Sequence, residues 1–206
     1  MFFLFWTNPY IAIIGDMKDI KYKDDIFSKF IITLGDEFQG LLCNGANTMH
    51  ILFEIEQRMY PVKIRFGVGV GEITTDVNRE MAIGADGPGY YNARTAIEYL
   101  KANEKRKQNK PANIRFEIDG DNQASTIMIN TILSLMTVIK DSWSDRQREI
   151  IWDMFEHQDS QLDVAKRLAI KQPSVQKSLS TGKYYSFKDA FDTIGQALKE
   201  IRRKNV

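Results

Sequence analysis

The stretch from Phe30 to Leu42 constrains the fold of this chain more than any other segment. Two apolar runs of strand type flank a corner made of Gly35, Asp36 and Glu37. This pattern is typical of a β-hairpin with acidic residues at its tip. The sequence therefore predicts two antiparallel strands over about residues 27–42.

A second carboxylate, Asp16, follows another apolar run, Tyr10–Gly15. If this run is a strand beside the hairpin in one sheet, the carboxylates of Asp16 and Asp36 lie close together. Two close carboxylates repel each other unless a proton or a cation lies between them. Oxygen ligands suit Mg²⁺ (or Mn²⁺) that carries a phosphate substrate. A metal site is therefore one interpretation of these residues, and two solvated turn residues, which are common in Gly-Asp turns, are the other.

Length and charge set broad limits on the class of protein. A chain of 206 residues forms one medium domain or two small ones, and its net charge of +1 favours no particular partner. The single cysteine, Cys43, excludes an intrachain disulfide and suits a reducing compartment, so we expect a cytoplasmic protein. Cys43 lies in an apolar run and is expected to be buried.

The chain starts with an apolar segment, Met1–Trp6, that Thr7, Asn8 and Pro9 interrupt. The segment lacks a basic flank and is too short to cross a membrane. We expect these side chains to pack on the domain or at a dimer contact, unless they are foreign to the natural chain. No membrane partner is expected.

The first two thirds of the chain alternate strand and helix signals, which predicts an α+β domain. In the segment Val62–Ile73 apolar residues alternate with Arg or Gly, so the glycine face leaves room for a helix or a ligand. The other expected elements are helices over about 47–59, 88–103 and 124–140 and a strand over 114–118.

From Trp143 onward only helical patterns remain, and we place a domain boundary near Asp141. This divides the chain into an α+β domain, 1–141, and an all-α domain, 142–206. Ser144 followed by Gln147 predicts a capping box at the first helix. Further helices are expected over about 162–168, 172–182 and 187–203.

The segment Leu162–Leu179 has the spacing of a helix-turn-helix motif. A polar face would point outward to enter a major groove. The residues predicted to pack the two helices together are Val164, Ala165, Leu168, Val175 and Leu179. The side chains predicted to contact DNA are Lys171, Gln172, Ser174, Gln176, Lys177 and Ser180. Arg167 and Lys183 would extend the basic patch. The alternative is a helical bundle that serves dimerisation or clasps the first domain.

Four motifs together resemble the SatD family, and the resemblance covers nearly the whole chain. They are Tyr10–Asp16, Thr33–Leu42, Ile64–Gly71 and Gly84–Arg94. The resemblance implies a bacterial protein with a C-terminal helix-turn-helix, and it implies little about mechanism.

The same motifs resemble class III nucleotidyl cyclases more distantly. That resemblance implies a ferredoxin-like sandwich that works as a homodimer with two Mg²⁺ ions. It implies that Asp16 and Asp36 hold the metal. The nucleotide-binding residues that it implies are Gly35, Glu37, Gly84, Asp86 and Arg94.

The chain departs from the cyclase pattern at several positions. Ile32 stands where adenine-selecting cyclases carry Lys, and Tyr90 stands where an Asn is expected, with Asn92 out of phase. Only about ten residues, Met17–Ile26, separate the first predicted strand from the hairpin, too few for a crossover helix. We therefore assign no catalytic residue and expect a site that binds a nucleotide or metal without turnover.

Three hypotheses about function follow. The first is a cytoplasmic, homodimeric regulator that senses a nucleotide or metal and binds DNA. The second is a Mg²⁺-dependent enzyme that acts on nucleoside triphosphates. The third is a protein-interaction adaptor in which neither site has chemistry.

Overall fold

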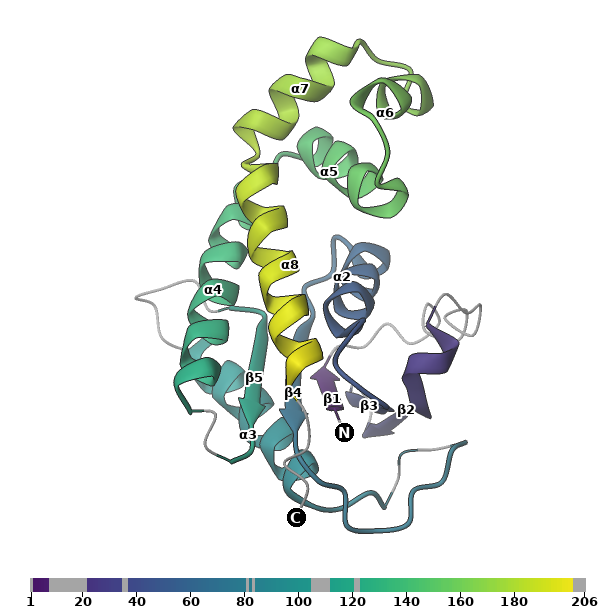
Figure 1. Cartoon of the computed structure of the whole chain (residues 1–206), viewed down its shortest axis with the longest axis vertical. Coiled ribbons are helices and arrows are strands. Elements are labelled where there is room, and N and C mark those ends of the chain that lie inside the picture. Colours follow the sequence, from purple (N-terminus) through teal and green to yellow (C-terminus); the bar gives the residue numbers. More distant parts are fainter. Residues whose placement is uncertain are drawn as a thin grey trace. The chain divides into compact units, whose positions relative to one another are not determined.

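The computed structural model describes residues 2–7, 22–34, 37–80, 82, 84–104, 112–120 and 123–201, and it has the predicted mixed α+β content. The strands of the described part are β1 (Phe2–Thr7), β2 (Ile26–Leu34), β3 (Glu37–Leu42), β4 (Arg65–Val70) and β5 (Ile114–Ile118). Its helices are α2 (Thr48–Met59), α3 (Pro88–Glu104), α4 (Gln123–Asp141), α5 (Asp145–His157), α6 (Gln161–Arg167), α7 (Gln172–Thr181) and α8 (Tyr184–Glu200) (Figure 1).

Contacts within the chain divide it into two compact units. The sheet unit comprises residues 1–134 and 193–206, and the helical unit comprises residues 135–192. The change between units thus falls within α4 and within α8. The domain boundary predicted near Asp141 is a statement about which segments fold independently of each other. It stays a prediction.

The sheet unit is built on one five-stranded sheet with the order β2-β3-β1-β4-β5 (Figure 1). Among the described strands β4 and β5 run parallel, and the other neighbouring pairs are antiparallel. The hairpin prediction is confirmed, because β2 and β3 pair with Ile31 opposite Gln39 and Leu34 opposite Glu37.

The central position of the sheet belongs to β1, where the sequence predicted no strand. Phe2 pairs with both Leu42 of β3 and Val70 of β4, so this apolar start forms a central strand of the sheet. A continuous apolar run does not distinguish a central strand from other buried segments by periodicity. The predicted strand Tyr10–Gly15 lies outside the described residues. The connection Met17–Ile26, predicted to be too short for a crossover helix, lies outside them up to Lys21.

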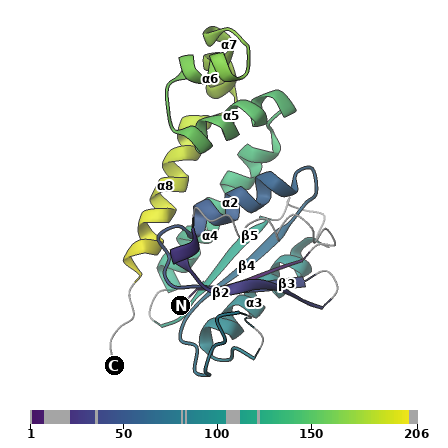
Figure 2. The same cartoon turned by 90° about the vertical axis from the view of Figure 1, so that its right-hand side faces the viewer.

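Glycines on one face of β4 let α3 approach the sheet closely. Phe66 and Val68 point to the opposite face and are fully buried. A Cβ atom on Gly69 would lie 2.0 Å from the carbonyl oxygen of Gly89, and one on Gly67 would lie 2.6 Å from the backbone nitrogen of Ile97. The predicted close approach therefore occurs, and its occupant is a helix. Figure 2 shows α3 on one face of the sheet and α2 on the other.

The sheet edge at β5 is closed by a side chain of α4. The Asn130 amide Nδ2 donates to the carbonyl oxygen of Phe116 at 2.7 Å, and its Oδ1 accepts from the backbone N–H of Phe116 at 2.8 Å. Asn130 is buried, so both outward-facing backbone groups of this residue are paired inside the protein. This contact protects the edge from pairing with another chain.

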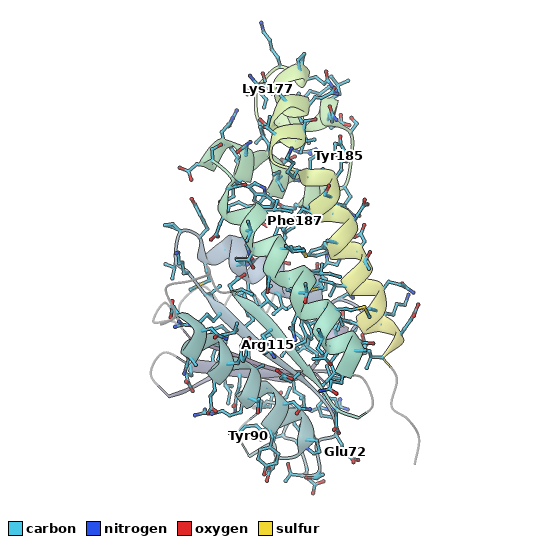
Figure 3. All side chains as sticks on the ribbon, turned by 90° about the vertical axis from the view of Figure 1, so that its left-hand side faces the viewer. Glu72, Tyr90, Arg115, Lys177, Tyr185 and Phe187 are labelled. Carbon is cyan, nitrogen blue, oxygen red and sulfur yellow. The ribbon has the colours of Figure 1, made fainter. Side chains whose placement is uncertain are left out.

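The helical unit has an aromatic core. The ring of Phe187, labelled in Figure 3, is buried. It lies 4.9 Å from the ring of Trp143 and 5.8 Å from that of Phe155, centroid to centroid, and these two side chains are also buried. The indole N–H of Trp143 donates to the carbonyl oxygen of Gly182 at 2.7 Å. The predicted capping box at Ser144 is present.

Two further observations bear on the sequence predictions. Cys43 is exposed, so the expectation of a buried thiol was wrong; it follows directly after the buried end of β3 and falls outside the core. In the part of the chain that the structure describes, no helix has the length and apolar character needed to cross a membrane.

Candidate functional site

The acidic hairpin tip is only partly within the described residues. Asp16, Gly35 and Asp36 lie outside them, so their pairing and the metal site stay predictions. The described residues contain no group of three or more His, Cys, Asp or Glu side chains that could hold a metal ion.

Glu37, the first residue of β3, receives two cations from α3. Its side chain is 12% exposed, and the Lys101 ammonium donates to its Oε1 at 2.6 Å. Nη1 of Arg94 lies 3.7 Å from its Oε2. Arg94 and Lys101 are seven residues apart, two helical turns, and therefore share one face of α3. The structure thus brings together the predicted residues Glu37 and Arg94.

Lys101 was missed at the sequence level. The seven-residue spacing from Arg94 was visible, but nothing in the sequence indicated that this face of α3 meets the start of β3. The three side chains form what we call the Glu37 cluster: Glu37, Arg94 and Lys101.

Arg94 has a second carboxylate partner. Its Nε donates to Oε1 of Glu98 at 2.9 Å, and this hydrogen bond, reinforced by Glu37, raises the pKa of the guanidinium. The Arg94 side chain stays 42% exposed. A guanidinium has five N–H donors, which suits it to contact more than one anionic group.

The loop that carries Gly84 and Asp86 is pinned by backbone contacts. The backbone N–H of Thr74 donates to the carbonyl oxygen of Asp86 at 2.8 Å, and the N–H of Asp86 donates to Oγ1 of Thr75 at 2.9 Å. Gly84 has φ +82°, a conformation that glycine adopts readily.

The carboxylate of Asp86 points to partners of its own. Its Oδ1 accepts from the N–H of Gly87 at 2.8 Å, and its hydrogen bond to Tyr91 raises the pKa of that phenol. These contacts tie Asp86 to the start of α3.

Tyr90 stands at the position where the cyclase pattern has the amide side chain of an Asn. Tyr90 is half-buried beside the core under α3, and Tyr90 and Glu72 lie near the same end of that helix (Figure 3). The nearby Asn92 donates from Nδ2 to the carbonyl oxygen of Val70 at 3.0 Å, which closes the end of β4. Asn92 therefore has a structural partner.

In the helical unit, α6 and α7 meet through buried small and apolar side chains. The relative exposure of Val164 and Ala165 in α6 is 0% and 4%, and Val175 and Leu179 in α7 are fully buried. These four residues are the ones that the spacing predicts for the interface, apart from Leu168, which is half-buried.

The turn between α6 and α7 has defined backbone geometry. Ala169 adopts φ +51°, the N–H of Ile170 donates to the carbonyl oxygen of Ala165 at 2.9 Å, and the N–H of Ala169 donates to that of Lys166 at 3.2 Å. These two bonds make a Schellman motif, which ends a helix and redirects the chain sharply.

Most residues predicted to contact DNA are exposed on α7 or at its start. The exposed ones are Lys171, Ser174, Gln176, Lys177 and Ser180. Figure 3 labels Lys177 on α7. Gln172 is half-buried, and its Nε2 donates to Oε1 of Gln161 at 2.7 Å, so its amide is partly committed to α6.

Arg167 does not belong to the basic patch. Its guanidinium lies 2.5 Å from carboxylate oxygens of both Asp153 and Asp159. These bonds raise the pKa of Arg167. The residue fastens α6 to the end of α5, and its charge is largely neutralised for any external phosphate.

A sheet unit with mixed strand directions is thus joined to a helical unit whose polar helix α7 faces solvent. The family model of the SatD family matches residues 14–188, and the chain belongs to this family. No curated protein and no solved structure matches the chain.

Proposed function

We propose that the protein is a cytoplasmic regulator that binds DNA through α6 and α7 as a helix-turn-helix. The observation that carries the proposal is the polarity of α7, whose inner side is buried and whose outer side holds exposed amide, hydroxyl and ammonium groups. Amides and hydroxyls at the start of a recognition helix read base edges, and lysines bind phosphates.

The turn geometry supports the same proposal. A helix-turn-helix needs a short turn that sets the second helix at a steep angle, and the positive φ of Ala169 together with the small Ala165 meets this need. The Arg167 ion pairs would hold α6 against the end of α5 during binding.

DNA binding is tested with duplexes that the full-length protein selects from a random library at low salt. We expect Lys177→Glu to weaken binding at least tenfold and to lower the slope of log K against log salt by about 0.9 for each phosphate that is no longer neutralised. Gln176→Ala is expected to relax sequence preference at one position. Fluorescence anisotropy measures both effects.

The matched control is Lys63→Glu, which makes the same change of charge at an exposed residue of the sheet unit. It should leave the affinity within about twofold, because the charge lies outside the proposed interface. Failure of the wild-type protein to select any duplex, or equal losses in Lys177→Glu and Lys63→Glu, would contradict the proposal.

We further propose that the sheet unit is a ferredoxin-like, cyclase-like domain that binds a nucleotide with Mg²⁺ or Mn²⁺ and does not turn it over. The order β2-β3-β1-β4, with each neighbouring pair antiparallel, is that of a ferredoxin-like sheet. The Glu37 cluster supports a phosphate site, because two cations converge there beside the predicted metal ligand Asp36. The commitments of Tyr90 and Asn92 weigh against catalysis.

Nucleotide binding is tested by thermal unfolding with each nucleoside triphosphate and Mn²⁺. We expect one nucleotide to raise Tm of the wild type and Arg94→Ala to lose most of that shift, because stabilisation follows ligand affinity. Arg58→Ala is the control, since Arg58 makes the same i,i+4 pair with Glu54 on α2. An equal shift in both variants would contradict the proposal, and product seen by mass spectrometry would favour the enzyme hypothesis.

A further inference from the structure

One side of α4 is apolar and exposed, and among the residues that the structure describes none covers it. We infer that a second copy of this chain docks there, helix against helix. The surface, which we call the α4 stripe, consists of Ala124, Ile127, Met128, Thr131, Ser134, Leu135 and Val138.

The four large apolar side chains of the α4 stripe are open to solvent. Ile127 is 60% exposed, Met128 59%, Leu135 60% and Val138 58%. The opposite side of α4 is buried through residues such as Leu133. A helix that is apolar on both sides needs cover on both sides. The four side chains expose on the order of 450 Å², the size at which an apolar patch marks a binding site.

The charge pattern identifies the occupant. From Gln123 to Ile139 the helix carries no charged residue, so an acidic or basic partner finds nothing to pair with. A second α4 stripe is equally uncharged, and bringing the two together buries no charge. The stripe is therefore complementary to itself.

The spacing is also that of a helix pair. Ala124, Met128, Thr131, Leu135 and Val138 follow one another at four, three, four and three residues, the a and d positions of heptads. Thr131 is the middle of the series. A two-fold axis that passes between the two Thr131 residues places each α4 stripe against its copy. This holds for a parallel and for an antiparallel pair of helices.

The area sets the expected strength. Standard interfaces bury about 800 Å² per partner, with a lower limit near 600 Å². The apolar side chains supply roughly half to three quarters of this area, and the small residues between them supply more. We therefore expect a dimer that dissociates on dilution.

The proposed dimer interface depends only on α4, whereas its consequence for DNA binding rests on the proposed function. A two-fold dimer presents two copies of α7 and reads two half-sites. If the chain dimerises through the α4 stripe and binds no DNA, the interface stands and the proposed function fails. If DNA binding is found and the stripe variants dimerise normally, the interface fails alone.

Sedimentation velocity over a dilution series tests the dimer with the full-length protein. We expect the wild type to shift from dimer to monomer on dilution and Met128→Glu/Leu135→Glu to dissociate at least tenfold more readily. The control, Leu162→Glu, introduces one glutamate at a leucine that is 55% exposed on α6, and it should match the wild type. A wild type that is monomeric throughout, or a larger loss in Leu162→Glu, would overturn the inference.

A cross-link tests the axis directly and does not depend on destabilising changes. In a Cys43→Ser background, Thr131→Cys should form an intermolecular disulfide on mild oxidation, because the two Thr131 positions face each other. Thr95→Cys, an exposed position on α3, is the control and should stay reduced. Equal cross-linking in both variants, or none at Thr131→Cys, contradicts the assignment.

Discussion

Replacing Gly69 by alanine is expected to lower the free energy of unfolding of the sheet unit by about 3 kcal/mol or more. The added Cβ would lie 2.0 Å from the carbonyl oxygen of Gly89 and 2.2 Å from the backbone nitrogen of Ala93. Both contacts are backbone atoms of α3, so no side chain can rotate away, and α3 must move off the sheet. Urea unfolding followed by circular dichroism measures the loss.

Gly195→Ala is the matched control. A Cβ at Gly195 meets nothing within 4 Å, and this glycine lies inside α8. Alanine is the better helix former, so we expect this variant to be about 0.5–1 kcal/mol more stable than the wild type. Equal stability of the two alanine variants would show that α3 does not pack on β4 as described.

Phe187→Ala is expected to lower the free energy of unfolding of the helical unit by about 3–5 kcal/mol. The Phe187 ring is 2% exposed and contacts the rings of Trp143 and Phe155. Removing it leaves a cavity at the centre of the aromatic core and exposes Trp143 to water. A red shift of tryptophan fluorescence and an earlier urea transition measure the effect, and selected DNA should no longer bind.

The neighbouring Tyr185 provides the control, because it is aromatic, two positions away, and 53% exposed. Tyr185→Ala removes a hydrogen bond from Nε2 of Gln161 to the phenol oxygen, at 2.9 Å, on the surface. It should cost about 1 kcal/mol or less. A Tyr185→Ala variant as unstable as Phe187→Ala would contradict the assigned core.

The local elements were largely predictable from the sequence. Strand β5, helices α2 and α3 and the Ser144 capping box have the predicted ends to within one or two residues. Their signals are periodicity and capping residues, which act between positions a few residues apart. The buried positions of α6 and α7 follow from the same local spacing.

The partners of the strands and charges were not predictable in this way. The place of Phe2–Thr7 between β3 and β4, the convergence of Lys101 on Glu37 and the commitment of Arg167 to Asp153 join distant segments. Cys43 was misjudged for the same reason, because its neighbours in sequence are apolar while its own position lies beyond the strand end.

The sequence by itself determined the α+β character, the helices and strands named above and membership of the SatD family. The tertiary structure alone decided which strand occupies the centre of the sheet, which cations meet Glu37 and which apolar side chains of α4 are exposed. The physical reason is range: hydrogen bonding and amphipathic spacing are set by near neighbours, whereas strand order, ion pairs and exposure depend on how remote segments share one core.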